Sequence, residues 1–341
     1  MVLTLPTPTR TPPPEAFDPS NANLDNTSPT SSSYQQQQQA EEKPFTAWIP
    51  TPLHPTALSL ARKYFNVIQP EDEKSLNWWE FANCSIVTSG KLTKNEIEKA
   101  GKIGKLKIIT RNGVGVDSIP LSTCKSNSII VTNQPGCNSK AVAEIVLGLA
   151  ISLKRKLAQI DRTLRSGSKT LSIEWRCIGL ESKKIGLVGM GDIAKQVAKK
   201  FIGAFECEII VYSPTSSLDK WTGEIKHERV STLEELLKLS DVVSLHCPLN
   251  DQTRGLIGER ELEMMKDSAI ILNTARGGLI DEVALARALR DQVIFGAGID
   301  TLESEPPTLN RYPDLLSLEN VIVLPHVGAQ EEDSTKKALE E

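Results

Sequence analysis

The sequence has no excess of positive charge, because 39 Lys and Arg residues stand against 43 Asp and Glu residues and give a formal net charge of −4. A nucleic-acid-binding domain usually shows a basic excess, so nothing at this level favours one. The chain also lacks any apolar run near the roughly 20 residues that a membrane-spanning helix needs. We therefore expect no nucleic-acid partner and no membrane insertion, and a small molecule as the ligand.

Paired cysteines are missing as well. The six cysteines are scattered without a CxxC pair, so the spacing indicates neither a zinc site nor a disulfide framework, and we expect no metal. We interpret them as reduced thiols in a cytoplasmic protein.

Residues 1–43 offer few groups able to build a core. They are rich in Pro, Thr, Ser and Asn and end near a run of Gln, which is typical of a disordered low-complexity tail. A mitochondrial leader is rich in Arg and poor in acids, whereas this stretch has Arg10 as its only Arg and five acidic residues, among them Glu15, Asp18 and Asp25. Cytoplasmic localisation is therefore our expectation.

From Phe45 the pattern changes to short Val- and Ile-rich runs that alternate with helical patterns, which indicates βαβ units and the α/β fold class. Four candidate strands (TAWIP, SIVTS, LKIITR, IIVTN) precede one long apolar helix, AVAEIVLGLAISLKRKLAQ, that begins near Ala141. Six follow it (KKIGLVG, EIIVYS, DVVSLH, AIILNT, IFGAGID, VIVLPH), which matches a complete doubly wound dinucleotide-binding sheet. A chain of 341 residues is long enough for two domains, and the helix is long enough to connect them.

A glycine-rich turn lies between the first of these six strands and a helix. Gly189 permits a tight turn, Gly191 lets the backbone approach a diphosphate, and the small Ala194 allows the helix to pack closely on the strand. The N-terminus of the helix would supply free N–H groups to the anion. Asp192 is expected to cap the helix and to point outward. The alternative is a glycine turn without a ligand.

The second of the six strands ends at Ser213, where NAD recognition usually places an acid. An uncharged end does not repel a 2′-phosphate, yet no Arg is adjacent in the sequence and the nearest cation downstream is Lys220. We expect NAD, with NADP left open.

Three strand ends could present catalytic groups at one sheet edge. Arg276, Glu305 and His326 each follow a candidate strand. Arg has a fixed fork that can bind a carboxylate and a carbonyl oxygen together. His can donate or accept the proton that accompanies hydride transfer to a 2-oxo acid, and a carboxylate on the far ring nitrogen would orient it.

Taken singly, each of the three has a structural interpretation: Arg276 as a diphosphate contact, Glu305 as a loop acid, and His326 as a strand-end histidine. Their joint occurrence favours a catalytic site. Asp300 is interpreted as a cofactor contact, with a structural turn cap as the alternative.

The motifs GMGDIA, HCPL, NTARGGLIDE, GIDTLESEPP and LPHVGA occur in this order and resemble the D-isomer-specific 2-hydroxyacid dehydrogenases, in particular the phosphoglycerate dehydrogenase and hydroxypyruvate/glyoxylate reductase branch. The resemblance covers about residues 45–330. It implies the catalytic set Arg276, Glu305 and His326. It implies cofactor contacts at Gly189, Gly191, Asp192, Ile193, Ser213, His246, Pro248, Ala275, Asp300 and Gly328. His246 would belong to the adenosine pocket.

The resemblance also implies the domain organisation. Two Rossmann-like domains are expected: a flavodoxin-like substrate domain at 44–145 and an inserted dinucleotide-binding domain at 146–325. Residues 326–341 would return to the substrate domain, and the protein would be a homodimer. Backbone amides at Ser89, Gly90, Val114 and Gly115 would hold the substrate carboxylate together with Arg276. Turns without a substrate role are the alternative.

The implied substrate is a small 2-oxo or D-2-hydroxy acid of the phosphoglycerate, hydroxypyruvate or glyoxylate type. Thr88 stands where family members that handle phosphoglycerate often have Arg, which argues against a substrate phosphate. Two other interpretations stay open: a nicotinamide-sensing scaffold like the C-terminal-binding-protein corepressors, and an inactive paralogue that is truncated shortly after His326.

Overall fold

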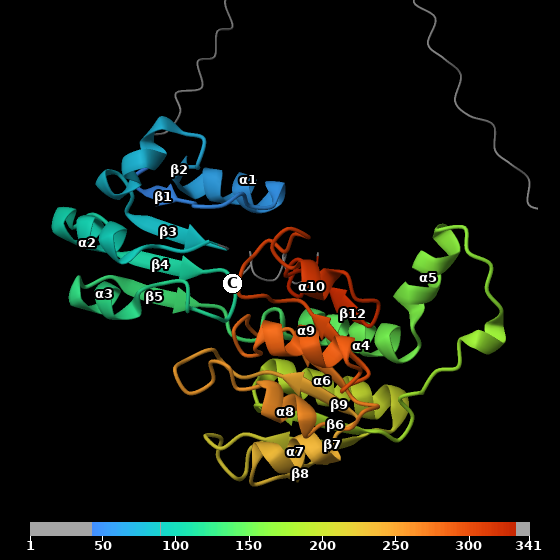
Figure 1. Ribbon diagram of the computed structural model, residues 1–341. Coiled ribbons are helices and arrows are strands. Elements are labelled where there is room, and N and C mark those ends of the chain that lie inside the picture. Colours follow the sequence, from blue (N-terminus) through green and yellow to red (C-terminus); the bar gives the residue numbers. More distant parts are fainter. Residues whose placement is uncertain (1–42, 89, 332–341) are drawn as a thin grey trace, which may run out of the picture. The chain divides into compact units, whose positions relative to one another are not determined.

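The computed structural model describes residues 43–88 and 90–331, which form two parallel β-sheets with helices packed on them (Figure 1). Residues 1–42 and 332–341 lie outside the described part. The predicted tail and most of the predicted C-terminal return segment therefore cannot be compared with the structure. None of the described helices is long and apolar enough to cross a membrane.

The first sheet has five parallel strands in the order β2-β1-β3-β4-β5, which is the flavodoxin-like order. Its elements are β1 (Thr46–Trp48), α1 (Pro55–Tyr64), β2 (Asn66–Ile68), the 3-10 helix η1 (Glu73–Glu80), β3 (Cys84–Val87), α2 (Lys94–Ile103), β4 (Ile108–Arg111), α3 (Leu121–Ser126) and β5 (Ile130–Asn133). The four predicted strands are present. The strand β2 was not predicted, because it is three residues long and begins with the exposed Asn66.

The second sheet has seven parallel strands in the order β12-β11-β10-β9-β6-β7-β8. The strands are β6 (Lys184–Val188), β7 (Glu208–Tyr212), β8 (Glu228–Arg229), β9 (Val242–Leu245), β10 (Ile270–Asn273), β11 (Gly296–Ile299) and β12 (Val321–Val323). Six of them were predicted, whereas β8, with two residues, is too short to leave a pattern. Strand β6 pairs with both β7 and β9. The order of the strands reverses there, and ligands bind at such a point in doubly wound folds.

Helices cover the second sheet on both faces. They are α4 (Ser139–Lys154), α6 (Asp192–Phe205), α7 (Leu233–Leu239), α8 (Glu259–Glu263), α9 (Glu282–Arg290) and α10 (Pro313–Leu316); α5 (Leu157–Arg165) and the 3-10 helix η2 (Ser172–Glu174) follow α4 along the chain. Helices α4 and α6 lie side by side and share one apolar cluster with β6 and β10.

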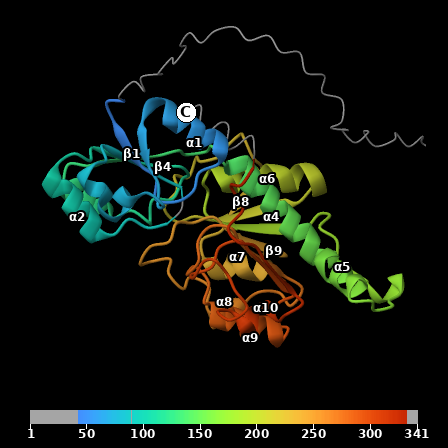
Figure 2. The ribbon, with the colours of Figure 1, turned by 90° about the horizontal axis from the view of Figure 1, so that it is seen from above.

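The prediction of one uninterrupted helix from Ala141 to Gln159 is wrong. Helix α4 ends at Lys154, Lys156 adopts a left-handed conformation with φ of +53°, and α5 begins at Leu157. The Lys154 side chain is buried and its Nζ donates a hydrogen bond of 2.6 Å to Ser268 O before β10, which ties the end of α4 to the sheet. After this anchor α5 continues beyond the end of α4 and projects away from the helices that cover the second sheet (Figure 2).

We expect Phe201→Ala to lower the free energy of unfolding by about 3–5 kcal/mol, because Phe201 is fully buried between α6, α4 and the second sheet and its loss leaves a cavity. Denaturant unfolding measures the change. Leu218→Ala serves as the control, since that side chain is 86% exposed and its loss should change the free energy by no more than about 0.5 kcal/mol. Equal costs for both variants would contradict this packing.

Candidate active site

The glycine-rich turn lies between β6 and α6 at the carboxyl edge of the second sheet. Gly189 has a φ of +107°, and a Cβ there would lie 2.6 Å from His246 O, so no larger residue fits. The fully buried Ala194 confirms the close packing of the helix on the strand. Asp192 is not the cap that was predicted: Gly191 is the N-cap, and Asp192 is the exposed first residue of α6.

The first turn of α6 has no side-chain cap. Its N–H groups are therefore available to an anion at the positive end of the helix. Two hydroxyls at the neighbouring strand ends, Thr274 Oγ1 after β10 and Thr301 Oγ1 after β11, are buried without a hydrogen-bond partner among the described residues. A glycine cradle, an open helix N-terminus and buried unpaired hydroxyls at one edge fit a bound dinucleotide.

Ser213 follows β7 and is buried, and its Oγ lies 2.8 Å from Ser216 Oγ. No Arg is adjacent to this strand end in the sequence, but one is adjacent to it in the fold. Arg229 on β8 donates through Nη2 to Ser213 O at 2.8 Å, because β8 pairs with β7 and aligns Arg229 with Val211. Sequence reasoning missed Arg229 because pairing of a two-residue strand leaves no periodic signal.

Arg276 lies in a turn that is stabilised by hydrogen bonds of the Asn273 side chain. The buried Asn273 donates through Nδ2 to Arg276 O at 2.8 Å and accepts from the N–H of Ala275 at 3.1 Å. Arg276 Nη1 donates to Ala275 O at 2.6 Å. This turn places the guanidinium at the carboxyl end of β10, as predicted, and Asn273 is a positioning residue that the sequence did not single out.

The guanidinium of Arg276 reaches the loop after β4 of the first sheet. Its Nε donates to Asp117 Oδ1 at 2.9 Å, and its Nη2 lies where a Cβ of Gly115 would stand, so a side chain at position 115 would displace the guanidinium. Burial alone would raise the pKa of Asp117, but the charge and hydrogen bond of Arg276 outweigh it and hold that pKa below its usual value. Asp117 was not predicted, although it lies in the RNGVGVD turn two residues after Gly115.

Of the residues predicted to hold the substrate carboxylate, Val114 and Gly115 lie in this loop after β4, and Gly90 lies after β3. Arg111, at the end of β4, donates through Nε to Gly115 O at 3.0 Å and through Nη1 to Val87 O at 3.2 Å, and thereby shapes the turn. The N–H groups of Val114 and Gly115 have no partner among the described residues. Gly90 has a left-handed φ of +81°, and Ser89 lies outside the described part.

His326 and Glu305 are in direct contact. His326 Nδ1 lies 3.0 Å from Glu305 Oε2, and both side chains are partly exposed. His326 follows β12 and adopts a φ of +59°, while its N–H donates to Asp300 O at 2.9 Å. The pairing of these two side chains is what the sequence predicted.

Asp300 lies at the end of β11 and is 1% exposed. Its two carboxylate oxygens accept the N–H groups of Val327 at 2.8 Å and Gly328 at 2.9 Å. A Cβ on Gly328 would lie 2.8 Å from Asp300 Oδ2, which requires glycine. These bonds give Asp300 the structural role weighed as the alternative, while its predicted cofactor contact stays a prediction.

The loops that carry Arg276 and Glu305 touch through Gly277. A Cβ there would lie 2.0 Å from the carbonyl carbon of Leu302 and 2.2 Å from Glu303 N, so the two backbones are in van der Waals contact. The Glu303 N–H also donates to Glu282 Oε1 at 2.7 Å. The relative position of the arginine and the carboxylate is therefore fixed by the backbone.

His246 and Pro248, the predicted adenosine contacts, follow β9. The N–H of His246 donates to Val188 O at 2.8 Å, and its Nε2 lies 2.9 Å from Ser244 Oγ. Burial lowers the pKa of His246 to about 3, so the ring is neutral near neutral pH. Pro248 is exposed.

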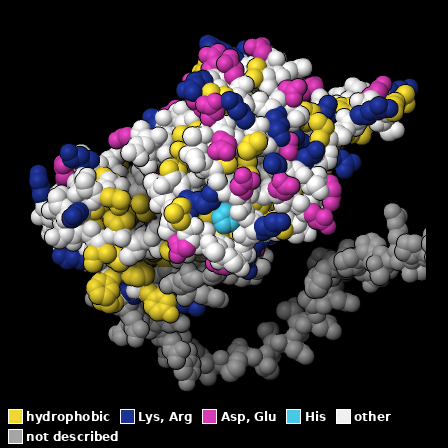
Figure 3. Space-filling view, turned by 90° about the horizontal axis from the view of Figure 1, so that it is seen from below, with side chains coloured by type: hydrophobic (Ala, Val, Ile, Leu, Met, Phe, Trp, Pro, Cys, Tyr) yellow, Lys and Arg dark blue, Asp and Glu magenta, His cyan; other side chains and the backbone are white. Residues whose placement is uncertain are grey.

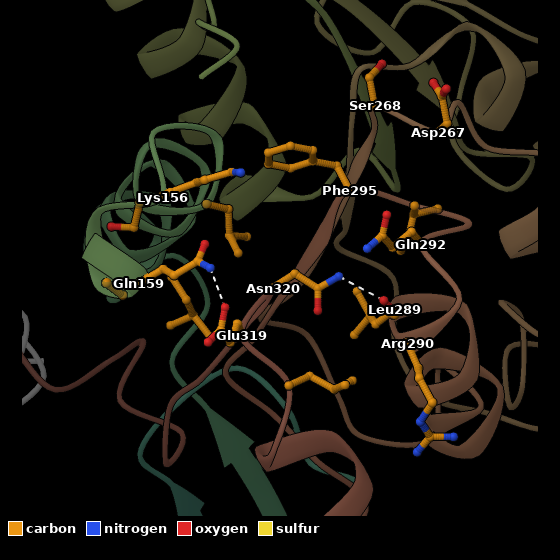
Figure 4. A pocket seen from close by; sticks show the side chains of 16 residues that line it. Lys156, Gln159, Asp267, Ser268, Leu289, Arg290, Gln292, Phe295, Glu319 and Asn320 are labelled. Atoms are coloured by element: carbon orange, nitrogen blue, oxygen red, sulfur yellow. Dashed lines mark hydrogen bonds between the residues drawn. The ribbon is translucent and has the colours of Figure 1, made fainter. Parts of the chain in front are cut away.

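A cavity of about 630 Å³ lies at the opposite edge of the second sheet (Figure 4). Phe295 and Asn320, which line it, immediately precede β11 and β12. Gln159 Nε2 donates to Glu319 across this cavity, and Asn320 Nδ2 donates to Leu289 O at 3.0 Å. It is thus separate from the strand ends that carry Arg276, Glu305 and His326.

Gly277→Ala should disrupt the site, since its Cβ would overlap the Leu302–Glu303 backbone and overpacking of this kind costs about 1–3 kcal/mol. We expect a lower melting temperature, read by circular dichroism. Gly179→Ala is the matched control, because nothing lies within 4 Å of a Cβ there. Unchanged stability of Gly277→Ala would show that the two loops are not held in contact.

The pKa of His246 predicts a pH dependence of stability. In the unfolded chain His246 takes up a proton below pH 6.5, whereas in the folded state it does so only near pH 3. As the pH is lowered from 6.5 toward 3, the free energy of unfolding should therefore fall by up to about 1.4 kcal/mol for each pH unit. The slope is absent above pH 6.5. Comparing His246→Gln with the parent at pH 7 and pH 5 isolates this effect: the variant should lose less stability on acidification, and parallel losses would argue against a neutral ring in the folded state.

Comparisons with known proteins identify the family. Residues 147–328 match the model of the D-isomer specific 2-hydroxyacid dehydrogenase NAD-binding domain. The chain is 39% identical to D-3-phosphoglycerate dehydrogenase of Methanocaldococcus jannaschii over 85% of its own length and 54% of that protein, so it spans about half of that relative. It is 38% identical to hydroxypyruvate reductase of Thermotoga maritima, covering 74% of this chain and 79% of that protein.

Among solved structures, D-lactate dehydrogenase from Aquifex aeolicus in complex with NAD and lactic acid is similar, with a TM-score of 0.75, 27% identity, and coverage of 86% of this chain and 92% of that one. The two-domain parallel fold, the glycine cradle and the family match agree. The chain belongs to the D-isomer-specific 2-hydroxyacid dehydrogenase family.

Proposed function

We propose that this protein interconverts a small 2-oxo acid and the corresponding D-2-hydroxy acid with a nicotinamide dinucleotide. The observation that carries the proposal is the 3.0 Å contact between His326 Nδ1 and Glu305 Oε2 beside the strand end that holds Arg276. An imidazole oriented by a carboxylate can move a proton, and a guanidinium can hold an anionic substrate.

The dinucleotide would lie along the carboxyl edge of the second sheet, where it supplies the hydride at nicotinamide C4 when bound. Gly189, Gly191, Asp192 and Ile193 would receive its diphosphate at the start of α6. The neutral His246 and Pro248 after β9 would line the adenosine pocket, and Ser213 would face the adenosine ribose. Ala275, Asp300 and Gly328 would surround the nicotinamide.

Arg276 would hold and polarise the substrate. Its Nε and Nη1 are engaged by Asp117 and Ala275, which fixes the fork and leaves Nη2 beside Gly115. The N–H groups of Val114 and Gly115, together with Gly90 and Ser89, would complete a carboxylate site there. A substrate carbonyl whose oxygen lies near this fork becomes more electrophilic at its carbon, because the cation stabilises the negative charge that develops on the oxygen.

His326 would exchange the proton. A carboxylate can only accept a hydrogen bond, so the Nδ1–H of His326 points to Glu305 and Nε2 is the nitrogen left to face the substrate oxygen. During reduction the imidazolium donates a proton from Nε2 to that oxygen, and during oxidation the neutral ring accepts it. Glu305 would accept the hydrogen bond from Nδ1–H and fix the orientation of the ring.

The substrate class of the proposal is phosphoglycerate, hydroxypyruvate or glyoxylate. The face in Figure 3 carries Lys and Arg interspersed with Asp and Glu and no extended field of one sign, which suits a small substrate held by a few fixed groups. As domains we propose residues 44–145 for the substrate, 146–325 for the cofactor, and 326–341 as a return segment.

The homodimer and the cytoplasmic location are further parts of this proposal. Five apolar side chains on α5 and the segment after it are exposed: Leu157, Leu164, Leu171, Ile173 and Ile178. A second copy of the chain is the partner proposed to cover this surface. Sedimentation of the purified chain gives the oligomeric state directly.

Replacement of His326 by Ala should lower kcat by about 10²–10⁴-fold, the usual contribution of a positioned acid–base group. The assay follows the absorbance of NADH and NADPH with hydroxypyruvate, glyoxylate and 3-phosphohydroxypyruvate. His54→Ala is the control, because that histidine is exposed at the start of α1. Dinucleotide binding measured by fluorescence should survive in both variants.

Turnover that persists in His326→Ala would contradict the assigned proton donor. No turnover with any of these pairs, in a folded chain that binds the dinucleotide, would contradict the dehydrogenase proposal for these acids and favour a nicotinamide-sensing scaffold.

A further inference from the structure

One arginine, Arg229, holds the loop after β7 through hydrogen bonds to its backbone. Arg229 donates through Nη1 to Ser217 O at 2.6 Å and through Nη2 to Ser213 O at 2.8 Å and Ser216 O at 3.2 Å. Three carbonyls of the loop Ser213–Ser217 therefore point toward the guanidinium. A fixed positive charge therefore lies against the carbonyl of Ser213, the first residue of the loop.

No acidic side chain among the described residues is hydrogen-bonded to Arg229, so its positive charge is not neutralised by an ion pair. Among the described residues, Arg229 makes three hydrogen bonds, all to carbonyls, which leaves Nε and one hydrogen of Nη1 without a partner. The acidic Asp219 and Glu228 nearby are exposed, and Glu224 is paired with Lys195 of α6. The environment of Ser213 is thus cationic although its own strand carries no cation.

The position of the Arg229 charge bears on the choice between NAD and NADP. In doubly wound sheets the carboxyl end of the second strand faces the 2′-group of the adenosine ribose, where an acid selects the hydroxyl of NAD and a cation accepts the phosphate of NADP. Here the acid is replaced by Ser213, whose Oγ is 2.8 Å from Ser216 Oγ. In such a pair one hydroxyl donates to the other, which leaves the second free to donate to a phosphate oxygen.

We propose that Arg229, which reaches the loop from β8, makes this site selective for a dinucleotide with a 2′-phosphate, with one hydroxyl of the Ser213–Ser216 pair as the hydrogen-bond donor. The inference rests on the proposed function, because it assumes a dinucleotide at this edge. It differs from the expectation of NAD that followed from the local sequence, since the decisive cation lies 16 residues after Ser213 and reaches the loop only through pairing of β7 and β8.

Fluorescence of the reduced nicotinamide gives the dissociation constants of NADPH and NADH for the full chain without any substrate. The parent should bind NADPH at least about tenfold more tightly than NADH. Arg229→Ala should weaken NADPH about tenfold and leave NADH unchanged, and Ser213→Asp should reverse the preference because its carboxylate repels the 2′-phosphate. Lys220→Ala, which removes an exposed lysine of the same segment, should leave the ratio unchanged.

The assignment would be overturned by a parent that binds NADH as tightly as NADPH. It would also be overturned if Arg229→Ala weakened both dinucleotides equally, which would make Arg229 a loop clamp only, or if Lys220→Ala removed the selectivity instead. Selective binding of NADPH without turnover of any 2-oxo acid would leave Arg229 assigned and contradict only the dehydrogenase proposal.

Discussion

The buried carboxylate of Asp300 is the constraint on which the candidate site depends. It accepts the N–H groups of Val327 and Gly328, while the Asp300 carbonyl accepts that of His326. These three bonds tie the turn after β12 to the end of β11 and hold His326 at a positive φ, which a histidine adopts only where its surroundings compensate for the strain. The direction of the imidazole toward Glu305 therefore follows from the buried Asp300 side chain, whose hydrogen bonds go to backbone N–H groups and not to the imidazole.

Close backbone contacts connect this turn to the rest of the site. Gly277 brings the Arg276 turn against the Leu302–Glu303 backbone, and Gly115 brings the first sheet against the guanidinium. The candidate catalytic groups come from loops, but each loop is fixed by a glycine or by a buried polar residue such as Asn273. A site built this way is preorganised, so little of the binding free energy of a substrate is spent on ordering it.

The sequence predicted those parts of the fold that have a periodic signal: ten of the strands, the glycine turn and the three strand ends. It missed β2 and β8, which are too short for a pattern, and it joined α4 and α5 because an apolar period does not show the anchor of Lys154 on Ser268. Asp117, Asn273 and Arg229 were missed because each acts through a partner far along the chain or through a turn, and only the pairing of loops and strands reveals such contacts.

The central claim is that these strand ends direct a hydride to one face of a 2-oxo acid while His326 supplies the proton. Reduction of hydroxypyruvate or glyoxylate with a dinucleotide that carries deuterium at nicotinamide C4 tests it most directly. The account predicts one deuterium at C2 of the product, and the D configuration for the product of hydroxypyruvate. Product without deuterium, or an L product, would contradict it.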